Sequence, residues 1–585
     1  MTRIAVVKKN KCNPITCGNY LCIRLCPVNR MEEECIVRSP DNKVFISEEL
    51  CTGCGICVNR CPTEAISIIN LPEELDKEPI HRYGRNMFAL YNMPVPIPGK
   101  VVGIIGRNGI GKSTAVKILA GILKPNLGKE EASEKGADWK DIIAHFKGTE
   151  AQAFFEKMRD GKISLSYKPQ TVDDIPKQYK GKVKDLLKKV DEKKQLKEMA
   201  EALELTMLLD HEIGTLSGGE LQRVAIAAAS LKKAEVYFFD EPTSYLDSSQ
   251  RLKVSGFIRK LADEGASVVV IEHDLIVLDA MTDLIHVMYG QEGTYGVVSQ
   301  PKAAKAGINI YLTGYLREEN VRFRDHQIQF FAKPARDSAK FIPLTEWPAF
   351  QLKLGEFTLD TTPGKIGRGE SIGIVGKNGI GKTTFVKTLA GVIPTEHALS
   401  GFKVAYKAQY LQASDELVIS VLHNAIQKYE VQLMRPLDLK GLLMRKLNEL
   451  SGGELQRVAI AHCLSQEADI YLLDEPSAYL DVEQRLVVSK VIKDMISLTG
   501  RTALIVDHDI LFLDYLSDKL LVFSGEPARH GTVEGPYNME EGMNKFLTDL
   551  DITFRRDDEN RRPRANKLES QMDKEQKKTG KRYYA

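Results

Sequence analysis

The chain has 585 residues, 27% of them charged and 43% hydrophobic, with a formal net charge of +2. This length exceeds what one hydrophobic core usually organises, so about three or four domains are expected. No apolar run approaches the roughly 20 residues of a membrane-spanning helix, and residues 1–11 lack the apolar core of a signal peptide. We therefore exclude a complete transporter and expect a cytoplasmic protein.

A block of cysteines opens the chain. Nine of the ten cysteines fall between Cys12 and Cys61, and disulfides are rare in the cytosol, so this crowding indicates metal ligation. The second half of the block reads C-x2-C-x2-C-x3-C-P, the bacterial ferredoxin spacing, whose fourth cysteine usually serves the other cluster. The first half reads C-x4-C-x4-C-x3-C-P, a stretched version with the same ending.

Exchanging the fourth ligands predicts two 4Fe-4S clusters. One cluster is expected on Cys12, Cys17, Cys22 and Cys61, and the other on Cys26, Cys51, Cys54 and Cys57. Zinc, whose structural sites also use four thiolates, is the alternative. The remaining Cys35 and Cys463 are interpreted as small core residues.

A glycine-rich phosphate loop, G-x4-G-K-[ST], occurs twice. Each copy follows a strand-like apolar run, Val101–Ile105 or Ser371–Val375, and precedes a helical stretch. The glycines let backbone N–H groups surround phosphates, the lysine reaches the outer phosphates, and the hydroxyl residue binds magnesium. The nucleotide-binding residues expected in the two copies are Gly106, Asn108, Gly109, Gly111, Lys112, Ser113 and Thr114, and Gly376, Asn378, Gly379, Gly381, Lys382, Thr383 and Thr384.

Two carboxylates end a buried strand in each copy, in the sequences VYFFDEP and IYLLDEP. We expect Asp240 and Asp474 to hold the magnesium shell. Glu241 and Glu475 would then orient or deprotonate the attacking water. An acidic pair that only caps a helix is the alternative.

The repeated sequence LSGGELQR resembles the signature of ATP-binding-cassette proteins, and YKPQ, YKAQ, SYLD, AYLD and two histidines accompany it. In that family two cassettes stack head to tail and bury two ATP molecules. The resemblance implies that the first site combines Lys112, Gln170, Asp240, Glu241 and His273 with Ser451, Gly452 and Gly453. It implies that the second combines Lys382, Gln409, Asp474, Glu475 and His508 with Ser217, Gly218 and Gly219. Gln170 and Gln409 would join Ser113 and Thr383 at magnesium.

Further segments narrow the resemblance. PVNRM, ISIINLPEEL, HRYGRN, GINIYLTGYLREENVRFR and ITFRR, together with the cysteine block, make the chain similar to subfamily E of these proteins. These are the iron-sulfur ribosome-recycling ATPases, also called RNase L inhibitor proteins. Membership implies splitting of ribosomes after termination or stalling, with a release factor or Pelota-like factor in the A site and the small subunit retaining the protein. Initiation factors are further expected partners, and a monomer is expected. Tyr83 and Phe88 are family-matched candidates for adenine stacking, and Phe357 is a weaker one for the second copy.

The two copies differ by an insertion. Gln170 follows Lys112 by 58 positions, whereas Gln409 follows Lys382 by 27. Apolar residues at helical spacing on both sides of Gly148 predict a helix-loop-helix hairpin within residues 129–163. A decorative surface insertion is one interpretation. The resemblance implies a ribosome contact, and the hairpin carries positive charge suited to phosphate at Lys140, Lys147, Lys157 and Arg159.

The expected fold class is α/β, with two P-loop cassettes in tandem behind an α+β ferredoxin-like domain. The expected divisions are a cluster domain at 1–75, a first cassette at 76–300, a hinge at 301–340, a second cassette at 341–530, and a second hinge with a basic tail at 531–585. Arginine-rich strings occur in both hinges, with Phe323, Phe330 and Phe554 expected to be partly buried. Residues 567–581 are expected to be a solvated tail.

Three other functions are alternatives to ribosome recycling. A redox-responsive iron-sulfur ATPase in RNA metabolism or electron transfer would depend on an electron donor. A cassette ATPase of DNA repair or chromosome organisation would carry a long coiled coil between phosphate loop and signature, and this spacing leaves no room for one. The translation ATPases of subfamily F lack the cysteine block.

Overall fold

A computed structural model of the chain describes residues 3–9, 11–70, 78–129, 136–325, 327–328, 342–393, 402–409, 414–566 and 570–583. The chain divides into two compact units. Unit 1 comprises Met1–Pro242, Phe257–His273 and Met281–His326, and unit 2 comprises Thr243–Gly256, Asp274–Ala280 and Gln327–Ala585. Within the described ranges, none of the helices combines the length and the apolarity needed to span a bilayer.

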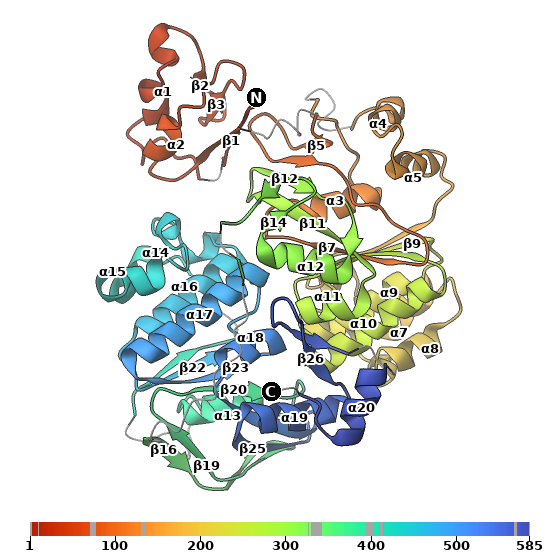
Figure 1. Cartoon of the computed structure of the whole chain (residues 1–585), viewed down its shortest axis with the longest axis vertical. Coiled ribbons are helices and arrows are strands. Elements are labelled where there is room, and N and C mark those ends of the chain that lie inside the picture. The colour runs from red at the N-terminus through yellow and green to blue at the C-terminus, as the bar shows by residue number, and fades with distance from the viewer. Residues whose placement is uncertain are drawn as a thin grey trace. The chain divides into compact units, whose positions relative to one another are not determined.

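The cysteine block forms a small α+β domain in unit 1, drawn in red in Figure 1. Its elements are β1 (Arg3–Val7), α1 (Leu21–Leu25), β2 (Ile36–Arg38), β3 (Val44–Ile46), α2 (Ile56–Arg60) and β4 (Ile66–Asn70). β1 pairs antiparallel with β4, β2 pairs antiparallel with β3, and α1 packs on α2. Cys22 and Cys57 lie inside the two helices, and Cys26 and Cys61 are the residues that end them. The ferredoxin-like architecture predicted from the spacing is confirmed.

The first cassette is built on a sheet in unit 1 with the order β5-β6-β12-β11-β7-β10-β9-β8, and β13 pairs with β11. The strands are β5 (His81–Arg82), β6 (Ala89–Tyr91), β7 (Val101–Ile105), β8 (Leu165–Lys168), β9 (Val236–Asp240), β10 (Ser267–Ile271), β11 (Leu284–Gln291), β12 (Tyr295–Val298) and β13 (Lys302–Ala303). β7, β9 and β10 run parallel and every residue in them is buried. Continuous apolar runs such as VVGII and VYFFD are typical of such doubly covered strands.

The helices of the first copy alternate with these strands along the chain. They are α3 (Lys112–Leu119), α6 (Ile175–Gln178), α7 (Val183–Val190), α8 (Leu196–Ala202), α9 (Gly218–Ser230), α10 (Ser248–Asp263), α11 (Leu275–Met281) and α12 (Ala304–Thr313). α3 and α9 both pack against β9, whose last residue is Asp240. The helix that follows the phosphate loop and the signature helix therefore both contact the strand that ends in the acidic residue.

The insertion in the first copy forms the predicted hairpin. α4 (Trp139–His145) and α5 (Glu150–Arg159) lie side by side, and Gly148 lies between them (Figure 1). The rings of Phe146 and Phe155 stack with centroids 4.8 Å apart, and Phe155 is fully buried in the core of the first cassette. Residues 130–135 of the expected insertion lie outside the described residues.

The second cassette repeats the arrangement in unit 2, with the sheet order β17-β18-β25-β24-β20-β23-β22-β21. The strands are β16 (Pro343–Trp347), β17 (Phe350–Leu354), β18 (Phe357–Thr361), β19 (Gly364–Gly367), β20 (Ser371–Val375), β21 (Val404–Lys407), β22 (Ile470–Asp474), β23 (Thr502–Val506), β24 (Lys519–Glu526) and β25 (His530–Asn538). The helices are α13 (Lys382–Leu389), α14 (Val418–Val421), α15 (His423–Lys428), α16 (Gly452–Ser465), α17 (Val482–Thr499), α18 (Ile510–Leu516) and α19 (Met539–Leu550). The expected boundary at residue 530 was placed too early, because β25 pairs along β24 inside this sheet.

The C-terminal segment differs from its prediction as a solvated tail. Ser570 caps α20 (Gln571–Thr579), and Asp573 of this helix is buried and accepts a hydrogen bond of 2.7 Å from the hydroxyl of Thr553. A charge-rich sequence hid these buried polar contacts, which depend on tertiary partners. Residues 567–569 lie outside the described residues.

The arginine-rich strings of the hinges contain both buried and exposed arginines, and Phe323 is partly buried, as predicted. Arg562 is fully buried, and Arg564 donates two hydrogen bonds to the carboxylate of Asp279 at 2.5 and 2.9 Å. Phe554, in β26 (Phe554–Arg556), is fully buried. The prediction for Phe330 concerns a residue outside the described ones.

Candidate nucleotide and cluster sites

The phosphate-loop lysines fold back into their own loops. Nζ of Lys112 donates to the carbonyls of Gly106 at 2.9 Å and Arg107 at 2.6 Å. Lys382 makes the equivalent bonds at 2.9 and 2.5 Å, and both lysines are buried. Burial lowers the pKa of Lys382 to about 8. An anion placed in the loop would stabilise the charged form of this lysine.

Glycine is required where each loop enters its helix. Gly111 has φ +91°, and a Cβ there would lie 2.5 Å from the ring of Phe88. Gly381 has φ +95°, and its Cβ would lie 2.8 Å from the ring of Phe357. Phe357 therefore occupies in the second copy the place that Phe88 has in the first. The two predicted aromatic candidates are structurally equivalent, which the sequence alone did not show.

Tyr83 has an exposed ring beside the first loop. Its side chain is 45% exposed, and its hydroxyl lies 3.1 Å from the hydroxyl of Thr114 in α3. The ring centroids of Tyr83 and Phe88 are 6.5 Å apart. A partly exposed aromatic face beside the loop is the feature that adenine stacking requires.

The acidic strand ends present a free oxygen. Asp240 and Asp474 are almost fully buried, and among the described residues Oδ1 of each has no hydrogen-bond partner. Ser113 bonds to the carboxylate of Asp240, and Thr383 bonds to that of Asp474. A hydroxyl beside an unsatisfied carboxylate oxygen fits a magnesium site, because magnesium prefers oxygen ligands.

The predicted glutamine, glutamate and histidine converge in both copies. Nε2 of Gln170 donates to Oε1 of Glu241 at 2.8 Å, and the corresponding bond of the second copy is also 2.8 Å. Nε2 of His273 lies 3.5 Å from Oε1 of Glu241, and Nε2 of His508 lies 3.6 Å from Oε1 of Glu475. In the second copy, burial lowers the pKa of His508 well below its usual value. The imidazole of His508 is therefore neutral, and its contact with Glu475 is not a salt bridge.

The second glutamate has the electrostatics of a general base. Burial, followed by the charge of Asp474, raises the pKa of Glu475 above its usual value. A base is most effective when its pKa lies near the working pH. The role of Glu475 as the base stays a prediction.

Each signature sequence begins a helix with a capping box. Ser217 accepts from the N–H of Glu220 and starts α9, and Ser451 does the same with Glu454 for α16. The first-turn N–H groups of such a helix attract anions. Gly218 and Gly219, and their counterparts Gly452 and Gly453, supply this first turn. Each signature lies in a different unit from the loop it is expected to face, so the facing arrangement stays a prediction.

Asp247 is a site residue that motif analysis did not assign. The segment Thr243–Gly256 of the first copy belongs to unit 2. There, Oδ2 of Asp247 accepts a hydrogen bond of 2.8 Å from the N–H of Asn378, in the second phosphate loop. Ser248 donates to the carbonyl of His508 at 3.0 Å. The available signal was the repeat of SYLD and AYLD at the same offset after both acidic strands.

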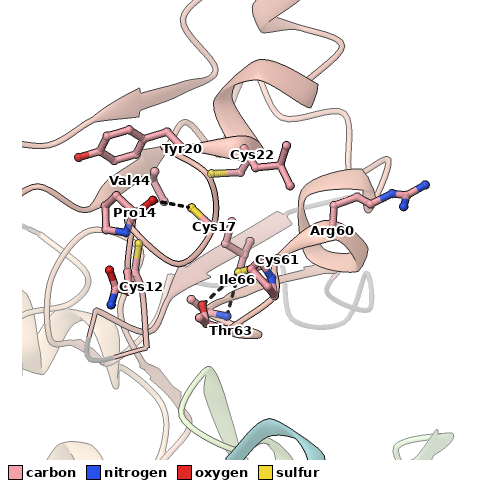
Figure 2. A pocket seen from close by; sticks show the side chains of 14 residues that line it. Cys12, Pro14, Cys17, Tyr20, Cys22, Val44, Arg60, Cys61, Thr63 and Ile66 are labelled. Atoms are coloured by element: carbon pink, nitrogen blue, oxygen red, sulfur yellow. Dashed lines mark hydrogen bonds between the residues drawn. The ribbon is translucent and has the colours of Figure 1, made fainter. Parts of the chain in front are cut away.

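Four of the predicted cluster cysteines surround one cavity. Cys12, Cys17, Cys22 and Cys61 line a pocket together with Pro14, Tyr20, Val44 and Ile66, and its volume of about 360 Å³ includes space open to solvent. Figure 2 shows their sulfur atoms around this space, with the side chain of Arg60 extending away from it. Burial, with neighbouring thiols as a smaller cause, raises the pKa of Cys22 to about 11. Such thiols must lose their protons when they bind iron.

The other predicted set also gathers in the domain core. Cys26, Cys51 and Cys57 are buried, whereas Cys54 is exposed. Burial is the main cause that raises the pKa of Cys57 to about 12, and the thiols of Cys51 and Cys54 add to it. Cys35, predicted as a core residue, is buried and hydrogen-bonds to the thiols of Cys26 and Cys51. Cys463 is buried in α16, as predicted.

The spacing of the thiols bears on the zinc alternative. Across the described part of the chain, no three His, Cys, Asp or Glu side chains are arranged to hold a single metal ion. A tetrahedral zinc site requires four sulfur atoms at about 2.3 Å from one point. The preference for clusters over zinc rests on the ferredoxin spacing of these cysteines.

Two residues of the first cassette hold the cluster domain. Nδ2 of Asn86 donates to the carbonyls of Ala5 and Ile46 at 2.8 and 2.9 Å, and its Oδ1 accepts from the N–H of Ile46 at 2.8 Å. Arg82 forms a two-pronged salt bridge with Glu48. Asn86 is buried, so these bonds are shielded from water. The cluster domain is thus attached on both sides of Tyr83.

Comparisons with known proteins agree with this arrangement. A family model described as ABC transporter matches residues 96–244 and 359–478. A model of a 4Fe-4S binding domain matches residues 44–67, and one of a possible Fer4-like domain in RNase L inhibitor matches residues 2–34.

Full-length relatives are similar along the whole chain. An uncharacterized ABC transporter ATP-binding protein of Methanocaldococcus jannaschii is 52% identical and covers 100% of this chain and 97% of its own length. ABC transporter E family member 1 of Arabidopsis thaliana is 45% identical over 100% of this chain and 99% of its own length. Translation initiation factor RLI1 of Saccharomyces cerevisiae is 43% identical, with coverages of 100% and 98%.

Two solved structures are also similar. One, described as a model of ribosome-bound archaeal Pelota and ABCE1, has a TM-score of 0.94 and 54% identity, covering 100% of this chain and 99% of that chain. The other is a complex of archaeal ribosomal stalk protein aP1 and archaeal ribosome recycling factor aABCE1. Its TM-score is 0.83 at 53% identity, covering 88% of this chain and 100% of that chain.

Proposed function

Because this chain belongs to the E family of ATP-binding-cassette proteins, which carry iron-sulfur domains, we propose that it is an ATP-hydrolysing ribosome recycling factor. It splits ribosomes into subunits after termination or stalling. Relatives described as a translation factor, and similar structures described as ribosome-bound or stalk-bound, support this assignment. Pelota-like and stalk proteins are accordingly its partners on the ribosome.

Each nucleotide site has the groups for hydrolysis. Lys112 and Lys382 bind the outer phosphates, and Tyr83 and Phe88 stack on adenine in the first site. Magnesium, when bound by Asp240 and Ser113 or by Asp474 and Thr383, neutralises phosphate charge. Glu241 and Glu475 orient the attacking water and take its proton. His273 and His508 contact these glutamates and face the outer phosphate.

Closure of the two cassettes requires nucleotide. We assign the first-turn amides that follow Ser217 and Ser451 to the outer phosphate bound by the other cassette, which they reach only in the closed state. The bond between Asp247 and Asn378 supports this arrangement, because it joins the first copy to the second phosphate loop. The two cassettes then act as a clamp with an open and a closed state. Shifting the ratio of closed to open molecules from 1:99 to 99:1 takes roughly 5.5 kcal/mol of difference in nucleotide-binding free energy between the two states. Two nucleotides could each supply part of this free energy.

The attachment of the cluster domain carries the proposal. Asn86 and Arg82 bond to it, and Tyr83 lies between them in the sequence. A change in the adenine site is therefore passed directly to the cysteine domain. The two clusters, held by Cys12, Cys17, Cys22 and Cys61 and by Cys26, Cys51, Cys54 and Cys57, make that domain a rigid body. It is pushed between the ribosomal subunits when the clamp closes.

Sedimentation of purified ribosomes tests this function. The protein, ATP and a release factor or Pelota-like factor should convert intact ribosomes to free subunits, with the protein on the small subunit. Omitting ATP should prevent splitting. Persistence of intact ribosomes under the complete conditions would contradict the proposal, and splitting that requires an added electron donor would favour a redox-responsive ATPase.

A further inference from the structure

Two buried lysines lie behind the acidic strand ends. They belong to the YKPQ and YKAQ segments, in which only the glutamine has been given a role above. Lys168 ends β8 and Lys407 ends β21, each on the strand beside the acidic strand. Their side chains are 0% and 2% exposed. Burying an ammonium group costs several kcal/mol unless it is well paired. A leucine or methionine could fill the same space without that cost. We therefore expect the ammonium group of each lysine to make a specific polar contact.

Both lysines donate to the same pair of main-chain carbonyls. Nζ of Lys168 lies 3.0 Å from the carbonyl oxygen of Asp240 and 3.3 Å from that of Glu241. In the second copy, Nζ of Lys407 lies 2.7 and 3.1 Å from the corresponding oxygens. The repeat of this geometry in two separate cassettes indicates a shared requirement.

A second donor reaches the glutamate carbonyl from the signature helix. Nε2 of Gln222 donates to the carbonyl oxygen of Glu241 at 2.6 Å, and Gln456 does so to Glu475 at 2.7 Å. The N–H of each glutamate is also fixed, because it donates to the neighbouring strand at 2.9 and 2.8 Å. The peptide groups on both sides of the glutamate are therefore held in place.

The glutamates need this support because their backbone is strained. Glu241 has φ +47° and Glu475 has φ +48°, in the left-handed region that residues with a side chain rarely adopt. Such a conformation costs about 1–3 kcal/mol and persists only where surrounding contacts enforce it. The φ of the glutamate sets the direction of its side chain. In this conformation its carboxylate lies within reach of the glutamine and the histidine.

We propose that Lys168 and Lys407 are positioning residues for ATP hydrolysis, each holding its glutamate in the left-handed conformation that aims the carboxylate at the attacking water. Gln222 and Gln456 are the second support of the same carbonyl. This inference rests on the hydrolytic part of the proposed function and is independent of ribosome splitting.

The test compares turnover and nucleotide affinity in the isolated full-length protein. Lys168→Met and Lys407→Met together keep the side-chain volume and remove both donors. ATP turnover should fall about 10- to 100-fold, as expected for a displaced catalytic group, while the Kd of a fluorescent ATP analogue changes less than about threefold. Because the readout is turnover without ribosomes, failure of ribosome splitting would not affect this result.

A background variant distinguishes positioning from general damage. In Glu241→Gln with Glu475→Gln, the added lysine substitutions should lower the residual turnover by less than about threefold, because residues that act as a unit are not additive. A full further loss in that background would overturn the inference. So would unchanged turnover in the lysine variant.

Two further variants complete the design. Lys162→Met with Lys403→Met removes lysines that lie just before the same two strands and should leave turnover unchanged. Gln222→Met with Gln456→Met removes the second donor and should reproduce the loss of turnover at constant Kd. If the lysine variant does not fold, the glutamine variant tests whether support of the glutamate carbonyl is needed for turnover. Normal turnover in the glutamine variant would then contradict the inference.

Discussion

The side-chain amide of Gln409 donates a hydrogen bond of 2.8 Å to Oε1 of Glu475. Glu475 is thus oriented by a neutral partner that does not compete for its charge, while burial raises its pKa. The same pair, with the same distance, occurs in the first cassette. The hydrogen bond from the glutamine identifies the glutamate as the group in each site that we expect to accept a proton from water.

Replacing both glutamates should separate binding from hydrolysis. Glu241→Gln with Glu475→Gln keeps an oxygen that can accept from the glutamine amides but removes the base. ATP turnover should fall by about 10²- to 10⁴-fold. Bound ATP should also dissociate slowly, since the clamp stays closed. Steady-state turnover and release of a fluorescent nucleotide measure the two effects. Glu416→Gln, an exposed carboxylate, is the control, and normal nucleotide release in the double variant would contradict our assignment of the base.

The crossed pairing of cysteines can be tested by iron content. Cys12→Ser and Cys61→Ser should each remove the same cluster, so combining them should cost no more iron than either alone. Cys12→Ser combined with Cys26→Ser should remove both clusters. Iron-to-protein ratio and visible absorption after anaerobic purification give the answer, with Cys463→Ser as the control. The uncrossed pairing predicts the opposite result for the two combinations.

Asn86 should determine how firmly the cluster domain is held. Asn86→Gly removes three buried hydrogen bonds, and glycine tolerates the φ of +52° at this position. Each buried group left without a partner costs about 1–3 kcal/mol. Hydrogen exchange should accelerate in β1 and β3 and stay unchanged in β7 and β10. Unchanged exchange in β1 and β3 would contradict this role. Asn448→Ala, on the surface of the second cassette, is the matched control.

The hairpin insertion should bind ribosomal RNA through its exposed lysines. Lys140 lies on α4, Lys147 lies between the two helices and Lys157 lies on α5, and all three are exposed. Changing all three to glutamate should weaken binding to small subunits. It should also reduce the slope of log affinity against log salt by about 3, because three phosphates would no longer be neutralised by a lysine. The same change at Lys428, Lys440 and Lys490 on the second cassette controls for net charge. Equal effects of the two sets would mean that the hairpin has no special role in binding.

Much of the site was predictable because its chemistry depends on short spacings. Within each phosphate loop, each acidic strand end and each half of the cysteine block, the residues lie a few positions apart, so local backbone geometry brings each group together. The hairpin was predictable for the same reason, since Phe146 and Phe155 each belong to a run of apolar residues at helical spacing. The tail at α20 was not, because the burial of Asp573 requires a partner, Thr553, that lies 20 positions away.

The sequence by itself therefore determined the motifs, the family resemblance, and the identity of the lysines, carboxylates and cysteines at the sites. Only the tertiary structure decided which groups from distant segments meet. The motifs that contain Lys168 and Lys407 assign them no role, and the sheet places both lysines behind Glu241 and Glu475. The HRYGRN segment likewise assigns no role to Asn86, which the structure bonds to the cluster domain. The physical reason is that a buried polar group is defined by its partners, and strand order and domain packing choose those partners.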